Sequence, residues 1–278
     1  MPLQTLDTGL FKLDGGAMFG VVPKPLWQKL NPPDEQNRCT WAMRCLLYEQ
    51  DGRVLLVDTG IGDKQDVKFF GHYDLHGDAS LLSSIQKAGY APTDVTDVLL
   101  THLHFDHVGG AVQRSGEQLL PTFPNAQYWT HPAHWQWATQ PNPRERASFL
   151  KENILPLQES GQLRFFGESP FPFGDVNLLF VDGHTEKMAL PIFRHNGRTV
   201  AYVADLIPSS AHVPLPYVMS YDVRPLLTMD EKAQLLQRAA DEGWILVFEH
   251  DPTVEAATVE LTDKGVRVKE RGKLAEFL

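Results

Sequence analysis

The chain has 278 residues, of which 42% are hydrophobic, and its formal net charge is −10. That length and apolar content suffice for one large domain, and an acidic chain without an evident basic patch argues against nucleic-acid phosphate as its partner. The sequence shows neither an apolar run of about 18 residues nor a secretion-type leader, so we expect a cytoplasmic protein without a membrane partner.

The first 38 residues begin with a strand-like segment at Leu3–Leu13, and residues 14–27 are dense in glycine, proline and apolar side chains. Glycine and proline at this density predict a loop. We therefore expect one domain over residues 1–278, in which residues 1–38 form a loop-rich N-terminal extension.

Apolar side chains in a loop usually lie against another surface. Met18, Phe19 and Trp27 are therefore expected either to pack on the core or to line a pocket for an apolar part of a ligand. The sequence leaves both interpretations open.

Segments 40–48 and 53–58 read as two strands joined by the turn at Asp51-Gly52, a strong hairpin signal. Asp58 at the end of the second strand is interpreted either as a carboxylate that orients a metal-binding imidazole or as a turn cap. The two cysteines, Cys39 and Cys45, would point to one face of the first strand, which disfavours a disulfide and predicts buried thiols.

Two histidines, His72 and His76, lie in a segment that reads as an irregular loop, and solvated side chains are favoured over metal ligation there. The run Ser80–Ala88 that follows has a helical pattern ending at Gly89.

The stretch from Thr101 to Gly110 follows the short apolar strand 97–100 and carries four candidate metal ligands within six positions. These are His102, His104, Asp106 and His107. Imidazoles packed this densely need partners for every nitrogen, and divalent cations would supply them. The spacing favours two metals, with the first two histidines on one and the aspartate and last histidine on the other.

After this motif, residues 126–130 read as a strand, and residues 132–157 as helices interrupted around positions 141–143. The aromatic side chains Trp135, Trp137 and Phe149 would make the interrupted segment a cover over the site. His131 and His134 are expected at the surface or the edge of the core.

Three further apolar runs stop at candidate ligands: residues 176–181 before His184, residues 198–204 before Asp205, and residues 244–248 before His250. One such coincidence would carry little weight. Three of them after a dense histidine motif predict a metal site assembled from distant strand ends.

In this order, these residues resemble the metallo-β-lactamase superfamily over about residues 40–255. The resemblance implies an α/β (α+β) fold, a four-layer αββα sandwich with a dinuclear site at one edge. It implies that His102, His104 and His184 bind one metal, that Asp106, His107 and His250 bind the other, and that Asp205 bridges them. The implied cofactors are two divalent ions, with zinc preferred over manganese, cobalt and iron.

Within the superfamily, residues 14–24 resemble those of quorum-quenching N-acyl-homoserine lactonases and the methyl parathion hydrolase group, and the presence of Asp205 favours such hydrolases over antibiotic-hydrolysing enzymes. Some lactonases carry a tyrosine three residues after the bridging aspartate. Here that residue is Pro208, and Tyr217 or Tyr221 are the candidate substitutes.

The implied chemistry is hydrolysis of the lactone and ester type. Two cations that share a water lower its pKa toward about 7, so that a bridging hydroxide can attack a carbonyl or phosphorus centre. Asp106 and Asp205 are the catalytic candidates, with Asp106 taking the proton, and Met18, Phe19 and Tyr221 are the candidate substrate contacts.

Our leading hypothesis is opening of an N-acyl-homoserine lactone. Hydrolysis of organophosphate triesters or of aryl and carboxylic esters at the same site is the nearest alternative. A metal-dependent non-catalytic protein or a diiron redox protein is an alternative of another class. We expect a small-molecule partner, and the sequence is compatible with a homodimer.

Overall fold

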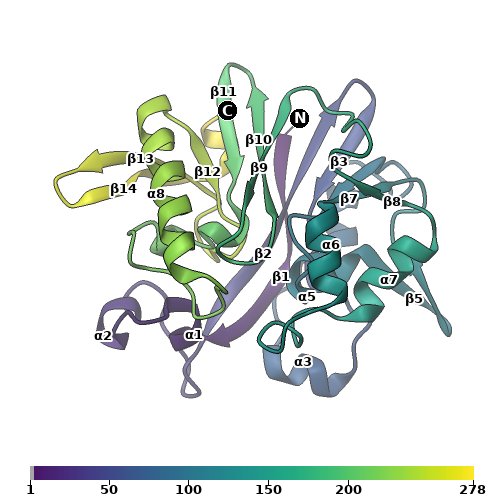
Figure 1. Ribbon diagram of the computed structural model, residues 1–278, viewed down its shortest axis with the longest axis horizontal. Helices are drawn as coiled ribbons and strands as arrows, with labels where there is room; N and C mark the ends of the chain where they lie inside the picture. Colours follow the sequence, from purple (N-terminus) through teal and green to yellow (C-terminus); the bar gives the residue numbers. More distant parts are fainter. Residues whose placement is uncertain (1–2) are drawn as a thin grey trace.

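The computed structural model describes residues 3–278 and contains two six-stranded sheets that pack face to face, with helices on the outside (Figure 1). Helix α8 lies on one side of the pair, and helices α6 and α7 lie on the other (Figure 1). The predicted four-layer αββα arrangement is confirmed.

The first sheet has the strand order β1-β2-β3-β4-β7-β8, antiparallel from β1 to β3 and parallel from β3 onward. Its strands are β1 (Leu3–Asp14), β2 (Arg38–Gln50), β3 (Arg53–Val57), β4 (Asp97–Leu99), β7 (Gln127–Thr130) and β8 (Leu163–Phe165). The hairpin turn between β2 and β3 places both Asp51 and Gly52 at positive φ, as a tight two-residue turn requires.

The second sheet has the order β14-β13-β12-β11-β10-β9, and only β11 and β12 are parallel neighbours. Its strands are β9 (Val176–Val181), β10 (Met188–His195), β11 (Arg198–Tyr202), β12 (Ile245–Val247), β13 (Ala256–Thr262) and β14 (Gly265–Gly272). A separate hairpin is formed by β5 (Val112–Ser115) and β6 (Gln118–Pro121).

Most helices are short, and α8 is the longest of those described. The α-helices are α1 (Gly15–Phe19), α2 (Lys24–Trp27), α3 (Val67–Tyr73), α4 (Leu81–Lys87), α5 (Phe105–Val108), α6 (Pro132–Thr139), α7 (Lys151–Glu159) and α8 (Pro225–Glu242). The 3-10 helices are η1 (Gly109–Ala111), η2 (Ala204–Leu206), η3 (Ser210–His212) and η4 (Leu274–Glu276). Within the described residues, no helix is long and apolar enough to cross a membrane.

The N-terminal segment differs from the expected loop-rich extension. Strand β1 pairs along its length with β2 and so belongs to the first sheet. Residues 15–27 form two short helices, with the Asp14 side chain capping α1 and Pro23 preceding α2. Glycine and proline here mark helix ends rather than a structureless loop. The segment expected as a loop around His72 likewise contains α3.

Apolar side chains fill three connected regions of the interior. One cluster lies mainly between the two sheets, a second lies beneath α4, α6 and α7, and a third surrounds α1 and α2. Trp27 and Phe19 belong to the third cluster, and both cysteines are buried free thiols, as predicted. The third cluster anchors the N-terminal helices beside the edge where the strand ends converge.

Candidate metal centre and active site

The candidate ligands predicted from the sequence meet at one edge of the sheet pair, and all are buried. They are His102, His104, Asp106 and His107 after β4 of the first sheet, and His184 after β9, Asp205 after β11 and His250 after β12 of the second. The first sheet and the second sheet therefore each contribute part of the site.

The loop after β4 is shaped by a close backbone approach. A side chain at Gly109 would collide with the carbonyl of Ile61, and one at Gly110 with the carbonyl of Thr59. Only glycine allows this contact, which closes the loop around the short helix α5. The glycine pair that follows the ligand motif therefore has a steric function.

The ligand atoms fall into two groups. Those of His102, His104, His184 and Asp205 lie within 4.8 Å of one another, and so do those of Asp106, His107 and His250. Asp205 lies between the groups, because its Oδ2 is 3.0 Å from His184 Nε2 and its Oδ1 is 3.0 Å from His250 Nε2. This grouping follows the partition of the other six side chains that the family resemblance implies, and Asp205 contacts a histidine of each group.

Each of the five imidazoles turns its outer nitrogen toward an acceptor. The outer contacts are His102 Nδ1 to Thr101 Oγ1 (3.1 Å), His104 Nε2 to Glu145 Oε1 (3.4 Å), His107 Nδ1 to Glu249 Oε2 (3.0 Å) and Asp58 Oδ2 (3.2 Å), His184 Nδ1 to Asp222 Oδ1 (2.8 Å), and His250 Nδ1 to the Ala42 carbonyl (2.8 Å). We infer that the outer nitrogens carry the protons. The inner nitrogens then present lone pairs.

These inner nitrogens converge on one another. His102 Nε2 lies 3.0 Å from His104 Nδ1, and His250 Nε2 lies 3.3 Å from His107 Nε2. Two lone pairs that face at this distance repel, and Asp205 Oδ1 is buried without a hydrogen bond among the described residues. Divalent cations would satisfy all of these atoms at once, so the residues present fit such ions.

The electrostatics of the side chains also call for positive charge. Burial lowers the pKa of His184, but the Asp205 and Asp222 carboxylates raise it, and the resulting pKa is about 10. The same balance, with Asp205 as the main carboxylate, raises the pKa of His250 to about 9. The buried carboxylates thus favour positive charge at the centre of the site, which is supplied by protons on these imidazoles in the absence of metal and by cations that replace those protons when metal binds.

Two carboxylates face the outer nitrogen of His107. Asp58 follows β3 at a positive φ of 56°, and it accepts hydrogen bonds from the backbone and hydroxyl of Thr101 at 2.8 and 2.6 Å. Its contact with His107 supports the orienting interpretation rather than the turn cap alone. Glu249 is the second carboxylate, and burial raises its pKa to about 7 despite the nearby imidazole.

Two other supporting carboxylates were not predicted from the sequence. Glu145, in the interrupted segment between α6 and α7, faces His104 and accepts a hydrogen bond from Thr185 Oγ1 at 2.7 Å. Burial raises its pKa, but hydrogen bonds from these partners lower it to about 2, so it is ionised at neutral pH. Asp222, before α8, holds His184. Both lie in irregular segments, where no periodicity marks them.

His134 differs from its expected place at the surface or core edge. It is fully buried, its Nε2 accepts a hydrogen bond from the Leu103 amide at 2.9 Å, and its Nδ1 faces the Glu186 carbonyl. Burial lowers the pKa of His134 to about 3. The expectation was wrong because each nitrogen of this neutral histidine has a hydrogen-bonding partner in the protein interior. His134 can therefore be buried beneath the ligand loop and support it.

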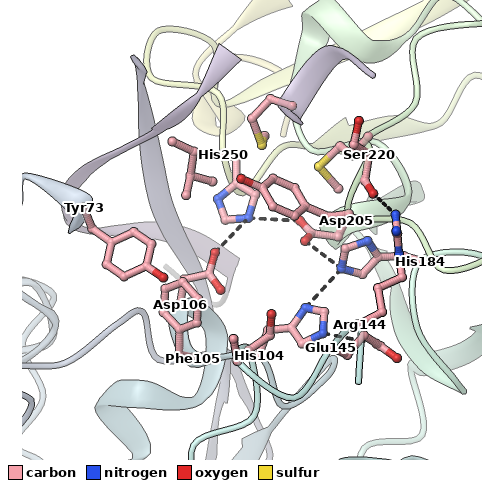
Figure 2. Close-up of a pocket in the computed structure, with 16 residues that line it drawn as sticks. Tyr73, His104, Phe105, Asp106, Arg144, Glu145, His184, Asp205, Ser220 and His250 are labelled. Carbon is pink, nitrogen blue, oxygen red and sulfur yellow. Dashed lines mark hydrogen bonds and ion pairs between the residues drawn. The ribbon is translucent and has the colours of Figure 1, made fainter. Parts of the chain in front are cut away.

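A cavity of about 350 Å³ opens onto the ligand cluster (Figure 2). Around it, His104, His184, Asp205, His250 and Asp106 form a ring, with Tyr73 beside Asp106 and with Arg144 and Ser220 near His184 (Figure 2). The apolar side chains of the wall are Leu13, Met18, Phe105, Ala147 and Met219.

The three predicted substrate contacts are placed differently. Met18 and Tyr221 line the cavity. Phe19 does not: it is fully buried between Trp27 and His212, with ring centroids 5.3 and 4.5 Å away. Met18 and Phe19 are consecutive residues of α1, and consecutive side chains of a helix point in different directions. The two side chains therefore lie in different surroundings.

Of the two tyrosines considered as substitutes at Pro208, only Tyr221 lines the cavity, since Tyr217 packs edge-on against Phe19. Tyr73 of α3 also lines the cavity, and the sequence did not predict this because its segment shows the pattern of an irregular loop.

A comparison with protein-family models matches residues 44–250 to the metallo-beta-lactamase superfamily. The chain belongs to this superfamily. The match extends from β2 to the last candidate ligand, His250, and so covers all seven strand-end side chains. Its membership in this superfamily and its buried histidine and aspartate cluster make the chain a metal-dependent hydrolase.

Individual relatives agree with this membership. A probable metallo-hydrolase, Rv2300c of Mycobacterium tuberculosis, is 26% identical over 277 residues, covering 85% of each chain. The crystal structure of a probable metal-dependent hydrolase from Staphylococcus aureus superposes with a TM-score of 0.88 at 26% identity, covering 98% of this chain and 96% of that one. AidC, described as a dizinc quorum-quenching lactonase in complex with its product, superposes with a TM-score of 0.80 at 20% identity, covering 98% and 95%.

Proposed function

We propose that this metallo-beta-lactamase superfamily member opens a lactone ring, with an N-acyl-homoserine lactone as the leading substrate and quorum quenching as the consequence. The observation that carries the proposal is a cavity lined by two kinds of side chain. The lining includes imidazoles and carboxylates of the ligand cluster, and it includes apolar side chains, two methionines among them.

The likeness to AidC supports this proposal, because that lactonase was solved with an N-acyl-homoserine product and shares the fold along nearly the whole chain. The seven strand-end side chains are proposed to hold two zinc ions. Such ions, when bound, lower the pKa of a shared water and polarise the substrate oxygen. The protein side chains supply the remaining functions.

Asp106 lines the cavity and is proposed to accept the proton of the attacking water, while Asp205 holds the two halves of the site in register. The outer carboxylates Asp58, Glu145 and Asp222 keep the imidazoles oriented through the reaction.

Two phenols are proposed to bind the substrate oxygens. Burial and the Asp106 charge raise the pKa of Tyr73 to about 12 and raise that of Tyr221 still further. Both hydroxyls therefore stay protonated at neutral pH, and within residues 3–278 neither donates a hydrogen bond to the protein. A lactone carbonyl or acyl-amide oxygen in the cavity would take such a donor. Met18 and Met219 would contact the acyl chain.

The test is a substrate panel on protein of measured metal content. We expect turnover of N-acyl-homoserine lactones of several chain lengths, detected as the ring-opened acid by mass spectrometry. Paraoxon-type triesters and aryl esters, the alternative substrates, are measured beside them, with an Asp205→Asn variant as the matched inactive control. No ring opening by fully metallated protein would overturn the proposal, and turnover of triesters or aryl esters alone would replace it with the esterase alternative.

A further inference from the structure

A lysine without a carboxylate partner is buried in helix α8, outside the ligand cluster. Lys232 has no exposed surface, and its Nζ donates hydrogen bonds to the carbonyls of His212 (3.1 Å), Pro214 (3.2 Å) and Tyr217 (2.8 Å). An ammonium has three donors, and here three acceptors receive them.

The three carbonyls belong to one irregular segment, residues 207–224, which connects η2 to α8. The only regular turn inside it is η3. Further along the same segment, Met219, Ser220 and Tyr221 line the cavity. Lys232 therefore fixes the backbone directly before the residues that form one wall of the cavity.

The same segment is also bound to helix α1, which carries Met18 of the apolar wall. The Nε2 of His212 lies 2.9 Å from the carbonyl of Met18, and the amide of Ser220 donates to the carbonyl of Ala17 at 2.8 Å. The ring of Phe19 stacks on His212 at 4.5 Å. Through His212, the lysine thus supports both methionines of the wall, Met18 on α1 and Met219 on the segment.

This arrangement is costly for stability. Burial lowers the pKa of Lys232 to about 7, and Asp222 is the charged group that opposes this effect. No carboxylate forms an ion pair with Lys232 in the part of the chain that the structure describes. A buried cation held only by neutral carbonyls contributes little to folding, because the loss of hydration offsets the hydrogen bonds that it gains. We infer that Lys232 instead fixes the backbone path of segment 207–224.

We propose that Lys232 is a positioning residue that sets the apolar wall of the cavity and thereby the selectivity for the apolar substituent of the substrate. This inference rests on the proposed function, in which that wall receives an acyl chain. Lys232 touches neither the substrate nor the ligand cluster, so its effect passes through the segment 207–224.

The experiment compares wild-type enzyme with Lys232→Met in the metallated full chain. Methionine keeps a long unbranched side chain but removes all three donors. We expect amide hydrogen exchange in residues 209–222 to be about tenfold faster. We also expect the ratio of kcat/KM for long-chain to short-chain acyl lactones to fall about fivefold, mainly through KM, a loss of the size expected for about one hydrogen bond. Metal content stays at the wild-type value.

Lys87→Met, an exposed lysine on helix α4, is the matched control and leaves the exchange and the ratio unchanged. Unchanged exchange and selectivity in Lys232→Met would overturn the inference, as would an equal loss for all substrates with loss of metal. If the variant does not fold, a measurement on the wild type decides. A slowly exchanging Lys232 ammonium signal in ¹H–¹⁵N spectra at pH 6 supports the three hydrogen bonds to the segment, and rapid exchange refutes them. If the wild type opens no lactone, the proposed function fails, and the exchange measurements still test Lys232.

Discussion

The two sides of the cavity are built in different ways. On the ligand side, side chains stand at the ends of sheet strands, and each imidazole is held from behind by an acceptor. On the substrate side, short helices and an irregular segment carry the wall, and a few backbone contacts hold them. The comparison shows that the candidate ligands stand at the ends of sheet strands, whereas the proposed substrate wall depends on short helices and an irregular segment.

The largest effect is expected where the ligand side is broken. Asp205→Ala removes the carboxylate between the two ligand groups, and His104→Ala removes one imidazole. We expect activity to fall by more than about 100-fold with loss of bound metal, because loss of a ligand exceeds the effect usual for an outer residue. Activity assays and elemental analysis measure both. A variant that keeps full activity and two metals would contradict the ligand assignment.

A smaller effect is expected one step away from the ligands. Asp222→Asn replaces the carboxylate that faces His184 Nδ1 by an amide of the same shape. We expect metal affinity or kcat to fall by about 10- to 100-fold, as is typical when such a partner of a metal-binding histidine is changed. Metal titration of chelated protein measures this. Wild-type affinity would show that the ligand side does not depend on its outer carboxylates.

On the substrate side, two tyrosines of the same segment offer a matched pair. Tyr221→Phe removes a hydroxyl that lines the cavity, whereas Tyr217→Phe alters a ring that packs on Phe19. We expect about a fivefold loss of kcat/KM for Tyr221→Phe, the value of one hydrogen bond of about 1 kcal/mol, and almost none for Tyr217→Phe. Equal effects of the two variants would remove Tyr221 from the substrate contacts.

The last effect concerns stability rather than activity and is shared by both sides. Burial lowers the pKa of His134, behind the ligand loop, and of His212, behind the apolar wall, from 6.5 to about 3. The unfolded chain binds these protons below about pH 6.5 and the folded chain only near pH 3, so their stability contribution is present above pH 6.5 and is lost as the pH falls toward 3. His134→Gln and His212→Gln should each flatten this acid loss, at about 1.4 kcal/mol per pKa unit.

Urea unfolding of chelated protein between pH 7 and pH 4 checks this expectation, because removal of metal excludes acid release of the ions as a cause. If the wild type and both variants lose stability in parallel, these two histidines are not the source of the acid sensitivity.

The sequence predicted the ligand side of the cavity better than the substrate side, for a physical reason. Each of His184, Asp205 and His250 follows an apolar run, and buried strands leave such runs in any sequence. Glu145, Asp222 and Lys232 act through contacts made by irregular backbone, whose path depends on tertiary packing and leaves no periodic pattern. Phe19 was assigned to the cavity because composition cannot tell which of two adjacent apolar side chains faces inward.

The division of the ligands between two sheets has a consequence for folding. The strands of the first sheet all lie before residue 166, and those of the second all lie after residue 175, so each sheet is a continuous half of the chain. Neither half alone holds a full ligand set. Metal ions would therefore bind to the full ligand set only when the two sheets are packed together. Metal affinity would then report on the stability of that packing. Mutations far from the site that loosen the interface between the sheets should weaken metal binding without touching a ligand.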